Sequence, residues 1–184
     1  MHKDQEIDLA LVERCRAGDA KAFEGLVVRY QRPIYNAAYR VSGNADDASD
    51  IAQIVFLKVS EHLHEYDQRY KFFSWIYRIA VNESISLLQR RRPEEALDED
   101  SALEAPEDTG PEWRYRQRQT ALQVQRALMG MKTDDRVVLT LRHFSECSYQ
   151  EIAQILALEE KTVKSRLFEA RQRLAALLPA LRPG

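Results

Sequence analysis

A short stretch near the C-terminus, TVKSRLFEARQRL at 162–174, carries side chains suited to reading DNA. On a helix, one face would be an apolar stripe formed by Val163, Leu167, Ala170, Leu174 and Leu177. The opposite face would carry Lys161, Ser165, Phe168, Glu169 and Gln172, with Lys164, Arg166, Arg171 and Arg173 along its edges. Polar side chains between two rows of cations fit a major groove, where base edges lie ahead and phosphates on either side. The alternative interpretation is a solvated helix face with ordinary charges.

The residues before this stretch predict a second, supporting helix. Ser148 and Glu151 have the spacing of a capping box, in which each side chain satisfies a backbone amide at the start of a helix. The buried face of that helix would consist of Ile152, Ala153, Ile155 and Leu156. Only a short turn around Leu158–Lys161 separates the two helices, although Ala157 and Lys161 stand where many such turns use glycine. The order predicts a helix-turn-helix whose second helix enters the groove.

The sequence contains no arrangement typical of catalysis. It has no G-x-G-x-x-G, P-loop, G-x-S-x-G or H-E-x-x-H motif. Cys15 and Cys147 are too few and too far apart for a disulfide framework or a zinc site, and the pair His62 and His64 lacks further ligands. We therefore expect a protein that is not an enzyme and that needs no metal or cofactor.

Charge divides the chain into three segments. Residues 93–112 carry nine acidic residues, three prolines and no Lys or Arg, whereas residues 113–184 carry thirteen basic residues against seven acidic ones. The acidic segment cannot bury enough apolar surface to offset its ordering entropy, which predicts a flexible linker. An acidic loop within one domain is the alternative, but so long an insertion is uncommon in a compact fold. The predicted organisation is an N-terminal domain at 1–92, a linker at 93–112 and a basic C-terminal domain at 113–184.

The N-terminal domain reads as helical throughout, so the predicted fold class is all-α, with two small helical domains. Residues 1–22 predict a short helix with Leu9, Leu11 and Val12 packing inward, to which we assign no function. One helix is expected around Phe23–Tyr30 and another beginning at Pro33. Two more are expected at 47–63, with acidic residues near its start, and at 72–92, ending in three arginines.

Aromatic residues are dense before and within the last of these helices: Tyr66, Tyr70, Phe72, Phe73, Trp75 and Tyr77. Large rings dominate small helical cores, so spacing alone favours a core role. A sharper alternative is that one or two of them, with Asn82 and the arginines 90–92, bind an unstacked base and the backbone of separated DNA strands.

Three of these segments, in this order, resemble bacterial RNA polymerase sigma factors of the extracytoplasmic-function (ECF) group. They are DASDIAQIVFLKV, FSWIYRIAVNESISLLQRRR and LRHFSECSYQEIAQILALEEKTVKSRLFEARQRL. The resemblance covers nearly the whole chain outside the linker. It implies a factor that binds core RNA polymerase and directs it to promoters, opening the minus-10 element and docking on the minus-35 element, while the polymerase performs the chemistry. Two modules on one tether raise each other's effective concentration at the promoter.

The resemblance also implies three sets of contact residues. Core polymerase would meet Asp47, Asp50, Gln53 and Phe56. The minus-10 DNA, including a flipped base of the non-template strand, would meet Tyr66, Trp75, Arg78, Asn82, Arg90 and Arg91. The minus-35 DNA would meet Lys161, Thr162, Lys164, Ser165, Arg166, Phe168 and Arg171.

The chain departs from the family pattern at two places. The polymerase-binding helix usually reads D-A-E-D-x-x-Q-E-x-F, and here Ser49 and Ile54 replace its two glutamates. Our hypothesis is that phosphorylation of Ser49 by a regulatory kinase restores the missing charge. Glu169 stands where many members carry an arginine, and a carboxylate accepts a hydrogen bond from cytosine N4, so the preferred minus-35 sequence should differ from the commonest one.

Two other functions remain open at this point. A simple helix-turn-helix regulator would need only residues 148–178 and would bind duplex DNA without polymerase. A protein-interaction adaptor would explain the acidic segment and an exposed Phe168, and its DNA affinity would show little dependence on salt. The N-terminus lacks a signal peptide's apolar core and no segment is long enough to span a membrane, so we expect a cytoplasmic protein, with an anti-sigma factor as another potential regulator.

Overall fold

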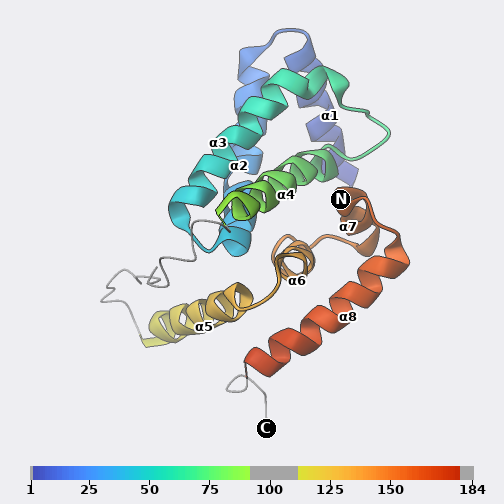
Figure 1. Cartoon of the computed structure of the whole chain (residues 1–184). Helices are drawn as coiled ribbons and strands as arrows, with labels where there is room; N and C mark the ends of the chain where they lie inside the picture. The colour runs from blue at the N-terminus through green and yellow to red at the C-terminus, as the bar shows by residue number, and fades with distance from the viewer. Residues whose placement is uncertain (1, 92–111, 179–184) are drawn as a thin grey trace.

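The computed structural model describes residues 2–91 and 112–178, and every regular element in these ranges is a helix (Figure 1). The N-terminal half contains α1 (His2–Arg16), α2 (Ala20–Ser42), α3 (Ala45–His62), the 3-10 turn η1 (Leu63–Glu65) and α4 (Phe72–Arg91). The C-terminal half contains α5 (Glu112–Met129), α6 (Thr133–Leu139), the π-helical turn η3 (Thr140–Phe144), α7 (Tyr149–Leu156) and α8 (Glu160–Leu177). The all-α prediction is confirmed.

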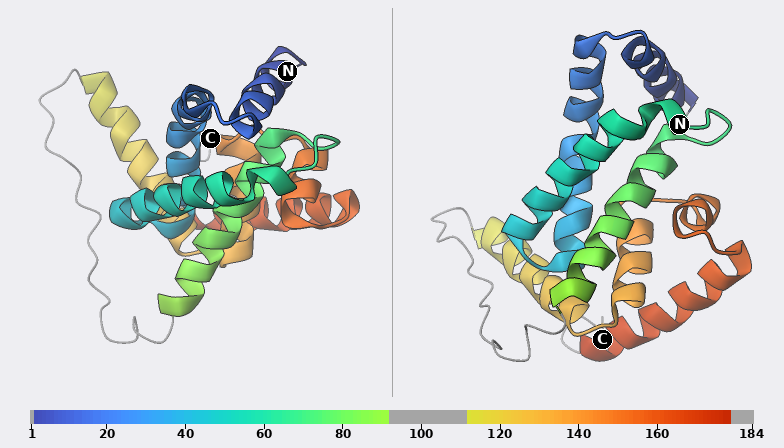
Figure 2. Two further views of the ribbon diagram at one scale, coloured as in Figure 1. Left: turned by 90° about the horizontal axis from the view of Figure 1, so that it is seen from above. Right: turned by 45° about the horizontal axis from the view of Figure 1, so that its top comes forward.

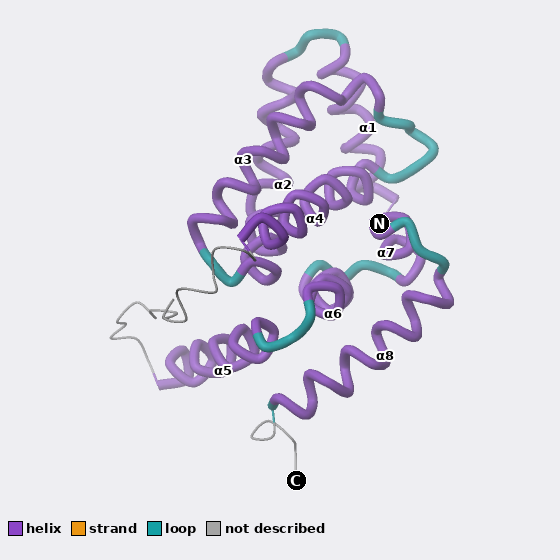
Figure 3. Tube along the Cα trace, viewed as in Figure 1, coloured by secondary structure: helices purple, strands orange, loops and turns teal. Residues whose placement is uncertain are grey.

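The expected linker at 93–112 lies outside the described residues except for Glu112, where α5 begins. The expected domain boundaries therefore stay predictions. Within the described ranges the helices follow one another through short turns (Figure 3), and none of them is long and apolar enough to cross a membrane.

Helix α2 corrects one expectation, because it runs unbroken for 23 residues with Pro33 inside it. The sequence predicted that Pro33 begins a helix, since proline removes an intrahelical hydrogen bond. Pro33 is exposed, and the buried side chains continue at helical spacing on both sides of it: Leu26, Tyr30, Ile34, Ala37, Ala38 and Val41. Burial of that continuous stripe outweighs the lost hydrogen bond. The expected N-terminal helix is confirmed as α1, in which Val12 is fully buried.

A tight turn at Gly43 and Asn44 lays α3 against α2. Gly43 has a φ of 78°, in the left-handed region that glycine enters without strain. The Asn44 side chain then accepts hydrogen bonds from the amides of Asp46 and Asp47, at 2.8 and 3.1 Å, and so caps α3. Packing of α4 against both helices completes the N-terminal core.

The C-terminal half contains the predicted helix-turn-helix, formed by α7 and α8. The capping box is present: Ser148 Oγ accepts from the Glu151 amide at 3.2 Å and Glu151 Oε2 accepts from the Ser148 amide at 2.8 Å. Of the predicted stripe on α8, Val163, Leu167 and Ala170 are buried, Leu174 is half-buried, and Leu177 is 47% exposed. The stripe therefore packs against α6 along most of the helix and ends before the last turn.

The two halves lie in direct contact, which the sequence did not predict. Helix α7 packs on α4, while α5 and η3 pack on α2 (Figure 2). The buried side chains of both halves form one continuous apolar cluster. At the α2–α3 turn, a Cβ atom on Gly43 would come within 2.3 Å of Met129 Sδ in α5. Gly43 is therefore needed for this close approach as well as for its backbone conformation.

Candidate functional site

The outward face of α8 is convex, polar and cationic. Lys161, Lys164, Ser165 and Arg171 are exposed, and the Phe168 side chain between them is 63% exposed. Thr162 and Arg166 are half-buried at its edges. Burial of the Val163–Leu167–Ala170 stripe on the opposite side fixes this face toward solvent. The exposure of Phe168, predicted from helical spacing, is confirmed.

The turn that holds α8 against α7 is shorter than expected and uses an alanine in a glycine-like conformation. It spans Ala157–Glu159, and Ala157 has a φ of 52°. The Leu158 amide donates to the Ala153 carbonyl at 3.0 Å, which closes the end of α7. Left-handed residues at this position are usually glycine or asparagine. The sequence has Ala157 where many such turns have glycine, and this alanine adopts the left-handed backbone conformation itself.

Several cations of α8 are already oriented by neighbouring side chains. Lys164 pairs with Glu160 at 2.7 Å, a hydrogen bond that raises the pKa of this exposed amine. The Arg171 guanidinium donates to His143 Nε2 at 3.2 Å. Burial lowers the pKa of His143, and the nearby arginines lower it further, which favours the neutral imidazole that can accept this bond.

Three further charged residues of α8 lie on or beside this face. Arg166 Nη1 lies 3.9 Å from Asp134, and Glu169 pairs with Arg173 at 3.0 Å. Arg173 also donates twice to the buried Asp135 of α6, at 2.7 and 2.8 Å, so it fastens α8 to the domain. Glu169 remains exposed beside Phe168, where the sequence expected it to alter base preference.

The second candidate surface is the face of α4 that carries Arg78, Asn82 and Arg90, all of them exposed. Half-buried Trp75 lies at its N-terminal end, beside a cleft of about 500 Å³. The N-terminal half lines this cleft with Glu65, Tyr66, Asp67, Tyr70, Ser74, Trp75 and Arg78, and the C-terminal half with Ala153, Gln154, Ala157, Leu158 and Glu159. An aromatic wall beside a cation suits an unstacked base, while the acidic side chains repel phosphate.

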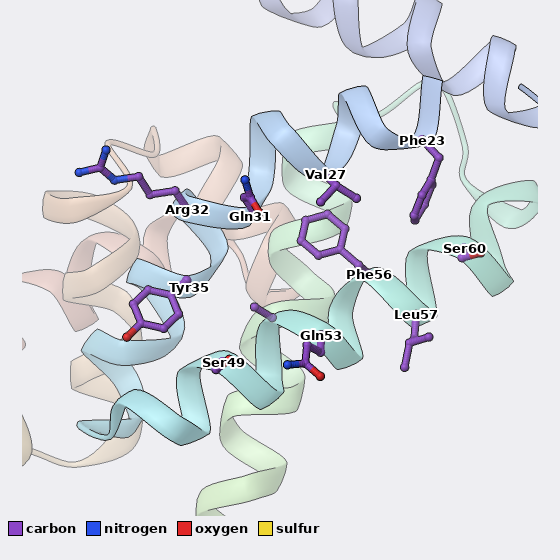
Figure 4. Close-up of a pocket in the computed structure, with 11 residues that line it drawn as sticks. Phe23, Val27, Gln31, Arg32, Tyr35, Ser49, Gln53, Phe56, Leu57 and Ser60 are labelled. Atoms are coloured by element: carbon purple, nitrogen blue, oxygen red, sulfur yellow. The ribbon is translucent and has the colours of Figure 1, made fainter. Parts of the chain in front are cut away.

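The third surface is an apolar groove between α2 and α3, with a volume of about 790 Å³ (Figure 4). Helix α2 lines it with Phe23, Val27, Gln31, Arg32 and Tyr35, and α3 lines it with Ser49, Ala52, Gln53, Phe56, Leu57 and Ser60. Leu57 is 62% exposed at its edge. Partly exposed apolar and aromatic side chains gathered in a concave surface are typical of a site that binds another protein.

Comparison with known proteins decides the family. A Sigma-70 region 2 domain matches residues 26–94, and a Sigma-70 region 4 domain matches residues 121–174. The RNA polymerase sigma-H factor of Pseudomonas aeruginosa is 35% identical over 190 residues, covering 97% of both chains. The ECF RNA polymerase sigma-E factor of Escherichia coli K12 is 35% identical over 178 residues, covering 92% of this chain and 93% of that one. The chain belongs to the ECF sigma factors.

Solved structures share the fold of this chain. CnrH, in complex with the cytosolic domain of CnrY, matches with a TM-score of 0.74 and 26% identity over 96% of this chain and 99% of that chain. The sigma factor RpoE of Bartonella quintana, in complex with the anti-sigma factor NepR, has a TM-score of 0.71 and 24% identity over 89% of this chain, and shows the shared fold. As an ECF sigma factor, the chain binds core RNA polymerase and promoter DNA and acts as a promoter-specific initiation factor in a family without catalytic activity.

The four residues expected to meet polymerase differ in their exposure to solvent. Asp50 and Gln53 are exposed on α3, and Phe56 is half-buried in the groove wall. Asp47 is only 3% exposed, and its two carboxylate oxygens accept from Arg91 at 2.6 Å each. In this sigma factor Asp47 ties the start of α3 to the end of α4, and its contact with polymerase stays a prediction.

Two of the expected minus-10 residues are likewise engaged within the protein. Tyr66 is 3% exposed, its ring packs against Phe72 and Trp75, and its hydroxyl donates to the Tyr70 carbonyl at 2.6 Å. It belongs to the core, the alternative that spacing favoured, and its ring is not available to stack on a base here. Arg91 is held by Asp47 as described. Trp75, Arg78, Asn82 and Arg90 keep solvent-accessible positions on or beside the α4 face.

Sequence reasoning missed the groove itself. It placed Phe23 and Val27 only on an expected helix at 23–30, and it gave no role to Tyr35 or Leu57. The sequence did contain a feature that could have revealed the groove. Helices α2 and α3 carry more apolar residues than one buried stripe on each helix requires. That surplus indicates a second apolar surface on the α2–α3 pair.

Proposed function

We propose that this sigma factor divides promoter recognition among the three surfaces. The α2–α3 groove and the exposed Asp50 and Gln53 bind core polymerase. The α4 face recognises and opens the minus-10 element, and the outward face of α8 docks on the minus-35 element. The observation that carries the proposal is the α8 face, where cations surround the exposed Phe168 on a rigidly capped helix-turn-helix.

The groove supports the polymerase role in two ways. Its exposed apolar rim at Leu57 provides area that is buried only when a partner binds. Its α3 wall begins close to Asp50, so a helical partner carrying basic residues would meet an apolar surface and an acid together. An anti-sigma factor that occupied the same groove would exclude polymerase, and we propose this as one mode of control.

Reconstituted transcription tests the function. Purified protein is added to sigma-free bacterial core polymerase with fragmented genomic DNA of the source organism, and the 5′ ends of the transcripts are sequenced. We expect discrete starts that share two upstream elements. Starts without a shared upstream element, together with no stable association with core, would contradict the proposal.

Phosphorylation of Ser49 is the second proposed mode of control. Ser49 is exposed, lies within the second turn of α3 and lines the groove. A phosphoryl group there would add charge where the family pattern has a glutamate, near the helix end that favours anions. Ser60 lines the same groove near the opposite end of α3 and provides a matched control.

The test compares Ser49→Asp with Ser60→Asp for binding to core polymerase. We expect Ser49→Asp to bind about two- to fivefold more tightly than the unmodified protein, a magnitude typical of one surface charge. Ser60→Asp should bind no more tightly. Equal affinities for Ser49→Asp and the unmodified protein would remove the phosphorylation hypothesis and leave the groove assignment intact.

A further inference from the structure

The outward face of α8 is bordered by a histidine from outside the helix-turn-helix. His143 lies in the π-helical turn η3, is exposed, and stands 28 residues before Arg171 in the sequence. The Arg171 Nε–H donates to His143 Nε2 at 3.2 Å. Arg171 is one of the minus-35 residues that the sequence led us to expect, whereas His143 is not. The surface that carries Arg171 therefore continues from α8 onto η3.

This hydrogen bond fixes the charge of the imidazole in the free protein. An arginine guanidinium has donors and no acceptor, so His143 Nε2 must accept and cannot itself carry a proton. The ring is therefore neutral, with its one proton on Nδ1. The pKa of His143 agrees with the geometry, because burial lowers it and the positive charges of Arg171 and Arg142 lower it further.

Helices α2, α6 and α7 also pack on η3, and the charged side chains that they bring to this part of the molecule are engaged with partners. The contacts are those of Arg40 with Gln125, Asp134 with Arg166, Asp135 with Arg173, Arg136 with the Val41 carbonyl, and Glu151 with Lys71. The charges that act on the His143 pKa are accordingly those of Arg171 and Arg142. The protonation of His143 therefore responds to an anion that approaches these two arginines.

Duplex DNA requires donors where the free protein presents an acceptor. Phosphate oxygens accept hydrogen bonds, so a surface that meets the DNA backbone needs N–H and O–H groups. In the free protein, His143 Nε2 presents a lone pair and occupies the Nε–H of Arg171. A proton taken from the solvent would convert Nε2 into a donor and release the Arg171 Nε–H. Both side chains would then offer a positive charge and a donor to phosphate.

Phosphate also opposes the influences that keep the ring neutral. An opposite charge within about 4–6 Å raises the pKa of a histidine. The same phosphates compensate the charges of Arg171 and Arg142, which lower the pKa of His143 in the free protein. Additional burial under DNA acts in the other direction. At an exposed position beside the highly charged backbone, the attraction of the phosphates is the larger effect.

We propose that His143 is a further minus-35 contact residue, which takes up a proton when α8 docks on duplex DNA and thereby releases Arg171 to a second phosphate. The proposal rests on the proposed docking of α8 on the minus-35 element. A group that holds its proton more tightly in the complex than in the free protein makes the complex tighter as the pH falls. One proton limits this dependence to about tenfold in affinity per pH unit.

A competing arrangement involves no proton. Arg171 could keep its bond to His143 and meet phosphate with its two terminal nitrogens only, since a guanidinium has five N–H donors. Duplex binding would then be independent of the protonation of His143. The two arrangements therefore differ in the dependence of affinity on pH.

The first experiment measures binding of the full chain to a fluorescent duplex of random sequence, about 20 base pairs long, at low salt concentration. Random sequence suffices, because phosphate contacts carry no sequence information. Affinity should rise about three- to tenfold between about pH 8 and about pH 6. The rise should shrink at high salt concentration, which screens the phosphates.

The variant His143→Gln separates the two roles of the ring. A glutamine oxygen can accept from Arg171 as Nε2 does, but the amide does not titrate. The variant should bind duplex within about twofold of the unmodified protein at about pH 8 and lose most of the rise at about pH 6. His62→Gln is the matched control, because His62 is also exposed but lies on α3 beside Glu65. It should keep the full rise.

Nuclear magnetic resonance measures the charge of the ring directly. The C2–H resonance of His143 is the one that disappears in His143→Gln. Addition of duplex should move its protonation midpoint to higher pH and leave that of His62 in place. An unmoved midpoint for His143, or an equal rise in affinity for His143→Gln and the unmodified protein, would overturn the proposal.

The variant Arg171→Ala distinguishes failure of this proposal from failure of the minus-35 assignment. Weaker duplex binding by Arg171→Ala, together with an unchanged pH dependence in His143→Gln, would leave α8 on DNA and remove the role of His143. Duplex binding that is weakened neither by Arg171→Ala nor by added salt would remove the α8 assignment and this proposal with it.

Discussion

The groove between α2 and α3 and the outward face of α8 are opposite in shape and chemistry. The groove is concave, its walls are mostly aliphatic and aromatic, and Arg32 is the one cation among its lining residues. The α8 face is convex, and cations surround its exposed aromatic ring. Burial of apolar area drives binding between proteins, whereas release of counterions drives binding to DNA. One small chain therefore presents two surfaces that differ in their response to salt. Rising salt concentration should weaken binding at the α8 face much more than binding in the groove.

The largest expected effect comes from placing a charge on the rim of the groove. Leu57→Asp should weaken binding to core polymerase about thirtyfold or more, because a desolvated apolar contact is replaced by a carboxylate. Val28, 70% exposed on α2 and outside the groove lining, provides the control. Val28→Asp should bind core normally in the same pull-down or fluorescence titration. Equal losses in both variants would show that polymerase does not use the groove.

Two aspartates on α3 should differ in role: Asp47 should stabilise the fold, and Asp50 should contact polymerase. Asp47→Asn should lower the free energy of unfolding by about 1–2 kcal/mol, because the paired Arg91 loses its charged acceptor but stays partly hydrated. Asp50→Asn, at an exposed position, should leave stability unchanged and weaken core binding. Urea unfolding and a core-binding titration on each variant measure both quantities. If the Asp47→Asn protein were as stable as the unmodified protein but bound core less tightly, Asp47 would be a contact residue and not a structural one.

A smaller effect is expected when a single cation is removed from the α8 face. Arg171→Ala should weaken binding to minus-35 duplex about tenfold and reduce the slope of log affinity against log salt by about 1. Core binding by the same variant should keep the salt dependence of the unmodified protein. The slopes come from fluorescence anisotropy at several salt concentrations. If the slope of log DNA affinity against log salt were unchanged in this variant, Arg171 would not contact a phosphate.

Local patterns predicted much of the C-terminal half. The Ser148–Glu151 capping box, the buried side of α8 and the exposure of Phe168 all depend on residues within a few positions of one another, and all are confirmed. Helical spacing alone decides which of these side chains face inward. The helix-turn-helix was therefore the part of the described structure most predictable from sequence.

The features that the sequence did not predict depend on contacts between distant segments. Pro33 lies inside α2 because buried residues on both sides hold the helix together. Asp47 is buried because Arg91, 44 residues away, reaches it. The groove needs the relative placement of α2 and α3, and the contact of α7 with α4 joins segments on either side of the undescribed residues 92–111. No pattern along the chain specifies such placements.

The contact between Lys71 and Glu151 also has a consequence for synthesis of the chain. A bacterial ribosome adds about 5–20 residues per second, so the 58 residues from Arg91 to Tyr149 take roughly 3–12 s to make. During that interval α1–α4 are already complete, but the helix that covers the start of α4 does not yet exist. Each newly made molecule thus passes through a period in which α1–α4 have been synthesised and α7 has not, so a polymerase or an inhibitor that meets the nascent chain then finds the start of α4 without the helix that packs on it.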